Sequence, residues 1–198
     1  MGCGGRVVDI ARPIIICAAS RSGSSLTAGI FAGHGCWVGR CRPGDQHNPK
    51  GYFENLDVKK KIKQEYWLKG KRNTDSFTEW VKNLLENSDY KGGPWLVKHG
   101  APAYWLWEQF DPIYISVRRT WEASQKSREN ALMPMNEQVR DRHDKAFKEL
   151  EKLGSKEIWP EKFKDGDFSE LKDAIEHCDL GYNQEVVDNF YDAKHWHY

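Results

Sequence analysis

The sequence predicts a single α/β domain of three layers, with a central parallel sheet flanked by helices and a mostly helical C-terminal third. Three short apolar runs, at 13–18, 95–98 and 112–117, are typical of buried strands. Stretches with helical periodicity separate them, and parallel strands need crossovers of this kind. With 198 residues, the chain is long enough to bury the core of one such domain.

The first strand and the helix after it begin the fold. Residues 13–18 form an unbroken apolar run, which is typical of a strand buried on both faces. A helix is expected from about 24 to 32, because Gly33-His34-Gly35 interrupts the pattern there. Residues 36–38 are expected to form a short second strand. We expect residues 1–12 to be a flexible N-terminal segment.

Helical periodicity fills the rest of the chain between and after the strands. The helices that separate the strands are expected at about 56–69, 77–88 and 102–110. Those of the C-terminal third are expected at about 120–131, 137–153, 169–178 and 184–192. This order brings the carboxyl ends of the strands to one edge of the sheet, where α/β proteins bind their ligands.

The composition argues against several classes of protein. Lys and Arg number 30 against 29 Asp and Glu, so a net charge of +1 provides no global field to attract nucleic acid. No apolar run approaches the ~18 residues of a membrane-spanning helix, so we expect no stable membrane insertion. Five cysteines without CxxC spacing indicate neither a disulfide framework nor a zinc site. We therefore expect a cytoplasmic protein with reduced thiols; the oligomeric state is left open.

The loop after the first strand has the composition of an anion-binding site. Compared with the phosphate-loop pattern GxxxxGK[ST], Gly23 takes the second glycine position and Ser25 the hydroxyl position, but Ser24 replaces the lysine and Ala18 the first glycine. The backbone N–H groups and the helix dipole at such a junction favour an anion, and Arg21 adds a planar donor. A nucleotide kinase needs both the lysine and a carboxylate for Mg²⁺. The sequence thus predicts a P-loop-like fold whose loop lacks kinase chemistry.

Three of the predicted strands each deliver a cation to the same edge of the sheet. Arg21 follows the strand at 13–18, Lys98 ends the strand at 95–98, and Arg118 and Arg119 follow the strand at 112–117. Carboxyl ends of parallel strands meet at one edge, so these cations are expected to lie close together. The arrangement indicates a ligand with several anionic groups.

Two of these segments resemble the sulfotransferase family. The stretch SRSGSSL resembles that family's 5′-phosphosulfate loop, usually a basic residue followed by SGTT or SGSS. The stretch IYISVRR resembles its 3′-phosphate site, in which an arginine and a serine eight residues later hold the phosphate. Arg119 and Ser127 have this spacing, and Arg118 is the near alternative. The resemblance covers residues 13–130.

The resemblance implies an enzyme that transfers a sulfuryl group from 3′-phosphoadenosine 5′-phosphosulfate (PAPS) to a hydroxyl or amine, in line and without a metal. The acceptor would be a small molecule or a glycan, and the product of the donor 3′,5′-adenosine bisphosphate. Arg21 and Lys98 would stabilise the developing charge. The implied donor-binding residues are Arg21, Ser22, Gly23, Ser24, Ser25, Leu26, Arg118, Arg119 and Ser127.

The general base is left open between two residues. His99 directly follows Lys98, whereas cytosolic members of the family place the catalytic histidine two residues after the lysine. Other sulfotransferases use a glutamate from the region after the first helix, and Glu54 fits this description. A glutamate suits this task if burial raises its pKa, and we favour Glu54.

Two other functions are compatible with the sequence. A nucleotide kinase or another P-loop phosphotransferase would share the fold. A catalytically inactive nucleotide-binding scaffold would share the fold and the donor site. The C-terminal third contains no RKGxxG segment, which completes the donor site in cytosolic sulfotransferases.

Overall fold

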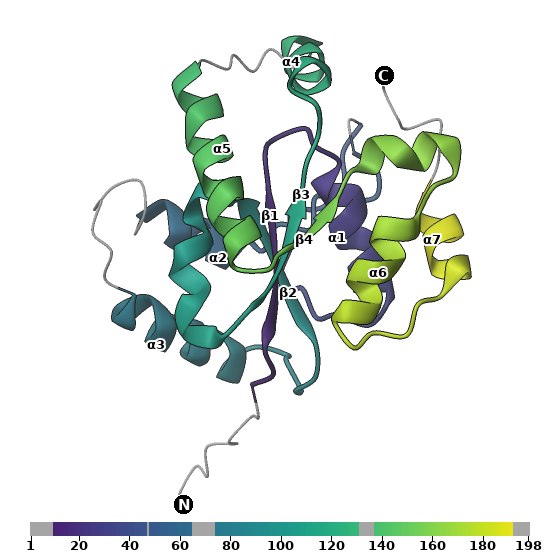
Figure 1. Cartoon of the computed structure of the whole chain (residues 1–198). Helices are drawn as coiled ribbons and strands as arrows, with labels where there is room; N and C mark the ends of the chain where they lie inside the picture. Colours follow the sequence, from purple (N-terminus) through teal and green to yellow (C-terminus); the bar gives the residue numbers. More distant parts are fainter. Residues whose placement is uncertain (1–9, 47, 65–73, 131–136, 192–198) are drawn as a thin grey trace, which may run out of the picture.

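The chain folds into a three-layer α/β structure, seen in a computed structural model that describes residues 10–46, 48–64, 74–130 and 137–191 (Figure 1). The central sheet has four parallel strands in the order β2-β1-β3-β4. Its strands are β1 (Pro13–Ala18), β2 (Trp95–Gly100), β3 (Ile113–Val117) and β4 (Lys156–Ile158). The predicted α/β class with a central parallel sheet is confirmed.

Helices cover both faces of this sheet (Figure 1). One face carries α1 (Ser24–Gly33), α6 (Ser169–His177), α7 (Gln184–Phe190) and the 3₁₀ helix η3 (Pro160–Asp165). The other carries α2 (Leu56–Ile62), α3 (Asp75–Glu86), α5 (Glu137–Lys152) and the 3₁₀ helix η2 (Ala101–Phe110). The remaining helix, α4 (Trp121–Asn130), lies beyond the carboxyl ends of the strands.

Strand β1 connects the two halves of the core, because its side chains alternate between the faces. Ile15 and Cys17 belong to the hydrophobic cluster under η2 and α3, whereas Ile14 and Ile16 belong to the cluster under α1 and α6. All six residues of the strand are buried. An uninterrupted apolar strand is therefore what a sheet covered on both faces requires.

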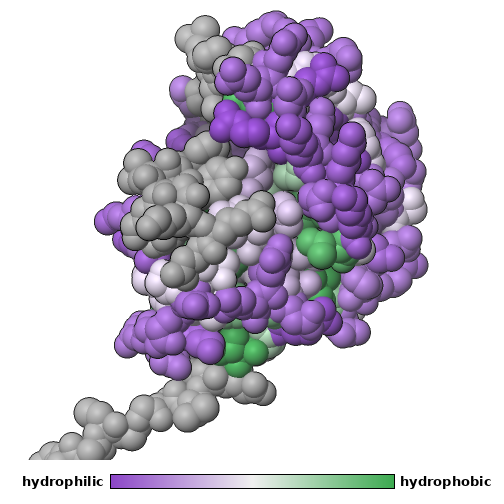
Figure 2. All heavy atoms as spheres, turned by 60° about the vertical axis from the view of Figure 1, so that its left-hand side comes forward, coloured by the Kyte–Doolittle hydropathy of each residue, from purple (hydrophilic) through white to green (hydrophobic). Residues whose placement is uncertain are grey.

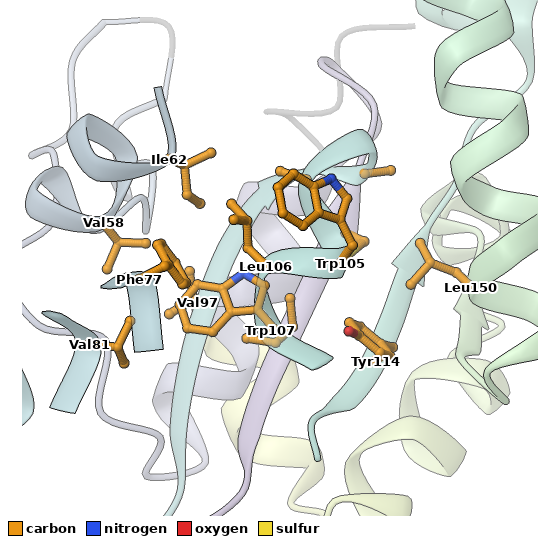
Figure 3. Packing of buried hydrophobic residues seen from close by; sticks show 14 of the residues in the cluster. Val58, Ile62, Phe77, Val81, Val97, Trp105, Leu106, Trp107, Tyr114 and Leu150 are labelled. Carbon is orange, nitrogen blue, oxygen red and sulfur yellow. The ribbon is translucent and has the colours of Figure 1, made fainter. Parts of the chain in front are cut away.

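Aromatic side chains from several elements lie among the aliphatic ones in the core under η2 (Figure 3). Trp107 is fully buried and meets the ring of Phe77 edge to face, with 5.1 Å between the ring centroids. It also lies 6.0 Å from the ring of Trp95 on β2. Such edge-to-face pairs stabilise a core beyond the area they bury, so these contacts help to hold β2 against η2 and α3.

The surface over α2, α3 and α5 is mostly hydrophilic, with small hydrophobic areas between polar side chains (Figure 2). Among the described residues, Leu153 is the large hydrophobic side chain with substantial exposure, at 51%. No helix in the described segments combines the length and apolar character needed to cross a membrane.

Several expected elements differ in the structure. The strand expected at 36–38 is reduced to one bridge between Trp37 and Trp95, because a single residue adds to the edge of β2. The helix expected at 102–110 is a 3₁₀ helix. Strand β4 was not expected, because its three residues are too short to produce an apolar pattern. Residues 1–9, within the expected flexible segment, and 65–69 of the expected helix lie outside the described residues.

Buried thiols, Cys36 and Cys178 among them, make the stability of the fold sensitive to alkali. Burial raises the pKa of Cys36, and likewise of Cys178, to about 12 from an ordinary value of 9.0. Above pH 9 the unfolded chain therefore loses thiol protons that the folded chain keeps. We expect the free energy of unfolding to fall by about 1.4 kcal/mol per pH unit for each thiol. The slope approaches this value only well above the ordinary thiol pKa of 9.0, so denaturant unfolding between about pH 9 and about pH 11 measures it.

The variant Cys178→Ala separates this effect from general alkaline unfolding. It removes one titrating thiol, so the slope should become shallower by the amount belonging to one proton, whatever the change in absolute stability. An unchanged slope in this variant would show that the thiol does not contribute.

Candidate functional site

The loop between β1 and α1 adopts a conformation suited to anions. Arg21 has a φ of 67° and Gly23 a φ of 86°, both in the left-handed region. Glycine adopts such angles freely, whereas for arginine they are uncommon and indicate a loop held in shape by its surroundings. Gly23 is also the N-cap of α1 and provides no side-chain cap. The first N–H groups of the helix thus have no side-chain acceptor and can bind an anion.

Lys98 supplies the cation that the loop itself lacks. Its Nζ donates a hydrogen bond of 2.9 Å to Ser25 Oγ, at the start of α1. Only 5% of its side chain is exposed, and its other close partner is Glu54, whose Oε1 lies 3.5 Å from Nζ. Lys98 reaches the loop because β2 pairs directly with β1. An ammonium group from the neighbouring strand therefore lies beside the hydroxyl position of the loop.

Glu54 lies immediately before α2 and between two lysines. It forms ion pairs with Lys98 and Lys59. The next residue, Asn55, fixes the start of α2 by accepting hydrogen bonds from the N–H groups of Asp57 and Val58. The position of Glu54 beside the loop is thus set by a helix cap.

The pKa values of Glu54 and Lys98 are both lowered, but for different reasons. Burial by itself raises the pKa of Glu54, but the attraction of Lys98 and Lys59 outweighs it, so the pKa is lowered from 4.5. Glu54 therefore lacks the raised pKa that would suit a general base, and its carboxylate is ionised at neutral pH. For Lys98, which is more deeply buried, desolvation outweighs the attraction of Glu54 and lowers the pKa from 10.5.

His99 faces away from this group. Adjacent residues of a strand point to opposite faces of the sheet, and the ring of His99 stacks on Trp107 at 6.0 Å in the core under η2. Trp107 Nε1 donates to His99 Nε2 at 2.7 Å, so Nδ1 carries the proton and donates to the carbonyl of Gly100 at 2.8 Å. Burial lowers the pKa of His99 to about 4. Both ring nitrogens are thus engaged within the protein.

Arg21, Arg119 and Ser127 come together at the same edge of the sheet. Arg21 Nε donates to Ser127 Oγ at 3.0 Å, and Arg119 Nη1 donates to the carbonyl of Arg21 at 2.9 Å. Arg119 Nε also lies 3.5 Å from Glu161 Oε1. Residues 106 positions apart in the sequence are therefore in direct contact, and the loop is fastened to the end of β3 and to α4.

Arg118, the alternative to Arg119, points elsewhere. Its Nη1 donates to Glu157 Oε1 at 2.6 Å, and its guanidinium lies 5.1 Å from the ring centroids of both Phe147 and Trp159. The alternation of side chains after β3 accounts for the difference between neighbours. Of the two arginines, Arg119 is the one in contact with the loop.

Two buried polar groups of the site have no hydrogen-bond partner within the described part of the molecule. Ser22 is fully buried in the loop, and its Oγ has none. Arg128, on α4 next to Ser127, is 6% exposed, and its Nε has none. Buried polar groups are normally hydrogen-bonded, and a bound ion or water is one explanation for an exception.

Sequence reasoning missed Arg128 and the carboxylate of Glu161. Arg128 was discoverable in principle, because Ser124, Ser127 and Arg128 have the spacing of one helical face. Glu161 had no local signal, since it follows the unexpected strand β4 by three residues. Its pairing with Arg119 depends on tertiary structure alone.

The chain matches no protein-family model, no curated protein and no solved structure. Among the described residues, no group of three or more His, Cys, Asp or Glu side chains could hold a metal ion. The case for a function therefore depends on the cations, hydroxyls and carboxylate gathered at the carboxyl edge of the sheet.

Proposed function

We propose that this chain is a PAPS-dependent sulfotransferase with a P-loop-like fold. The observation that carries the proposal is the contact of 2.9 Å between Lys98 Nζ and Ser25 Oγ. In a P-loop kinase, this hydroxyl is a ligand of Mg²⁺. Here a buried ammonium group lies beside it, which favours direct contact between protein cations and an anionic group over metal-mediated contact.

The donor fits the polar groups of the site. The N–H groups at the start of α1, the unpartnered Ser22 hydroxyl and Arg21 would hold the 5′-phosphosulfate. Ser127 and Arg119, which are already fastened to Arg21, would hold the 3′-phosphate. When bound, PAPS supplies an activated sulfuryl group, whose transfer breaks the bond from sulfur to the bridging phosphate oxygen and forms one from sulfur to the acceptor.

Lys98 and Glu54 divide the remaining chemistry. Lys98 provides fixed positive charge at the point where negative charge develops in such a transfer, a contribution that is largest in a site shielded from water. Glu54 would take the proton of the acceptor hydroxyl or amine. Glu54 is ionised at neutral pH and is only partly buried. It therefore fits this role better than His99, whose two ring nitrogens are both hydrogen-bonded within the protein. The acceptor is proposed to be a small molecule or a glycan.

Calorimetric titration tests the proposal. We expect 3′,5′-adenosine bisphosphate to bind without metal and at least about tenfold more tightly than ADP, because a second phosphate gains charge-assisted hydrogen bonds. Chelator should leave this affinity unchanged. Incubation with PAPS and a panel of hydroxyl and amine acceptors should then yield a sulfated product.

Each competing function predicts a different result. A nucleotide kinase should bind ATP in a Mg²⁺-dependent manner and show no preference for the 3′-phosphate, which would overturn the proposal. An inactive scaffold should bind the bisphosphate but transfer sulfate to no acceptor of the panel.

A further inference from the structure

The buried face of α4 is polar. Its three most buried side chains are Ser124, Ser127 and Arg128, with exposed fractions of 2%, 1% and 6%. A helix of a globular protein normally buries an apolar stripe, so hydrophobic packing does not explain why this face is enclosed. The face adjoins the loop, because Ser127 accepts the hydrogen bond from Arg21.

Arg128 is a buried cation whose charge the described residues do not balance. None of the described carboxylates forms an ion pair with it, and its Nε has no hydrogen-bond partner. Its neighbour at the site is a second cation, since burial first and then the charge of Arg21 lower the pKa of Arg128. Burying a charge without a partner costs stability, so this arrangement needs an anion to be favourable.

The neighbouring arginine is in a different situation. Arg119 contacts the carbonyl of Arg21 and lies 3.5 Å from a carboxylate oxygen of Glu161. Its charge is therefore compensated in part by the protein. The positive charge near Ser127 that no described carboxylate compensates is therefore that of Arg21 and Arg128. A dianionic phosphate at Ser127 would compensate it.

We infer that Arg128 is a ligand-binding residue that contacts the 3′-phosphate of the bound nucleotide, together with Arg21 and Ser127. The inference rests on the proposed function, which places a 3′-phosphate at Ser127. The planar guanidinium suits the two oxygens of a phosphate. The anion supplies the charge that the folded protein leaves unbalanced, and the unliganded protein carries an energetic cost at this position.

The test compares two ligands and two variants. In calorimetric titrations, Arg128→Met should lower the affinity for 3′,5′-adenosine bisphosphate by about 10- to 100-fold, because charge-assisted hydrogen bonds are lost. Its affinity for adenosine 5′-monophosphate, which lacks the 3′-phosphate, should stay within about twofold. The matched control is Lys126→Met, which removes an exposed cation from the same helix and should change neither affinity.

Thermal unfolding separates this role from a structural one. Without ligand, Arg128→Met should melt at the wild-type temperature or above it, since an unbalanced buried charge is removed. A residue with a merely structural role predicts the reverse pattern, a lower melting temperature with unchanged discrimination between the two ligands, and that result overturns the inference. Should the methionine variant not fold, Arg128→Lys tests the same point. Lysine keeps the charge but lacks the planar pair of N–H donors, so the preference of this variant for the bisphosphate should be weaker than that of wild type but not absent.

The outcomes also distinguish this inference from the proposed function. If the wild-type protein prefers the bisphosphate and Arg128→Met retains the full preference, the inference is wrong and the proposed function stands. If the wild-type protein shows no preference for the bisphosphate, the proposed function fails, and the inference fails with it.

Discussion

Replacement of Lys98 by methionine should reduce kcat/KM for the proposed sulfuryl transfer by about 10²- to 10³-fold, the loss typical of removing one fixed group that stabilises developing charge. Methionine fills much of the same space, and Glu54 keeps its ion pair with Lys59, so no buried carboxylate is left without a partner. The fold should therefore survive the change. Steady-state kinetics with PAPS and an acceptor identified from the panel measure the effect.

The exposed Lys60 on α2 provides the control for this variant. Lys60→Met removes the same charge from the surface and should leave turnover within about twofold of wild type, because surface charges are screened by salt. If Lys98→Met retains more than about a tenth of wild-type turnover, the ammonium group is not an essential part of the site.

The pH dependence of Lys98 offers a second check. Its pKa is lowered from 10.5, so on the alkaline side the ammonium loses its proton earlier than an ordinary lysine would. The activity that depends on this charge should fall as the pH rises toward 10.5. Arginine stays protonated throughout this range, so Lys98→Arg should be less active than wild type but should lose this alkaline limb.

The sequence predicted the central strand β1 of the sheet better than its edge strand β4. The run at 13–18 is apolar at every position, and the structure buries every one of these residues. By contrast, the three residues of β4 include two charged ones, and only Ile158 is fully buried. A strand at the edge of a sheet gives too few buried positions for a periodic signal.

Some contacts of the site depend on the order of the strands, which residue spacing in the sequence does not predict. Placing Lys98 at a strand end follows from the pattern, but its contact with Ser25 depends on β2 lying next to β1. The sequence alone did not determine this order of strands. The choice between Arg118 and Arg119 likewise depends on which side chain turns toward the loop, and spacing does not show this. The sequence favoured Arg119 because it lies eight residues before Ser127.

The change of Glu54 to glutamine should lower kcat by about 10²- to 10⁴-fold, the range associated with general-base catalysis, with little change in donor affinity. Glutamine has nearly the same shape, but it takes no proton from the acceptor. Asp57→Asn is the matched control, because Asp57 lies in the first turn of α2 and pairs with Arg40 at 2.7 Å rather than with Lys98. His99→Gln should affect stability more than turnover; full turnover in both Glu54→Gln and His99→Gln would remove both residues as candidates for the base.

The coupling between Glu54 and Lys98 makes the pH profile a sharper test than the rate alone. Because the two lysines lower the pKa of Glu54 from 4.5, the acid limb of kcat/KM should lie below that pH, where the carboxylate takes up a proton and its ion pairs are lost. In Glu54→Gln this limb should disappear. The attraction that partly supports the charge of Lys98 disappears as well, so the pKa of Lys98 should fall further and the alkaline limb of the residual activity should move to lower pH. An unchanged alkaline limb would mean either that Lys98 does not set this limb or that its pKa does not depend on Glu54.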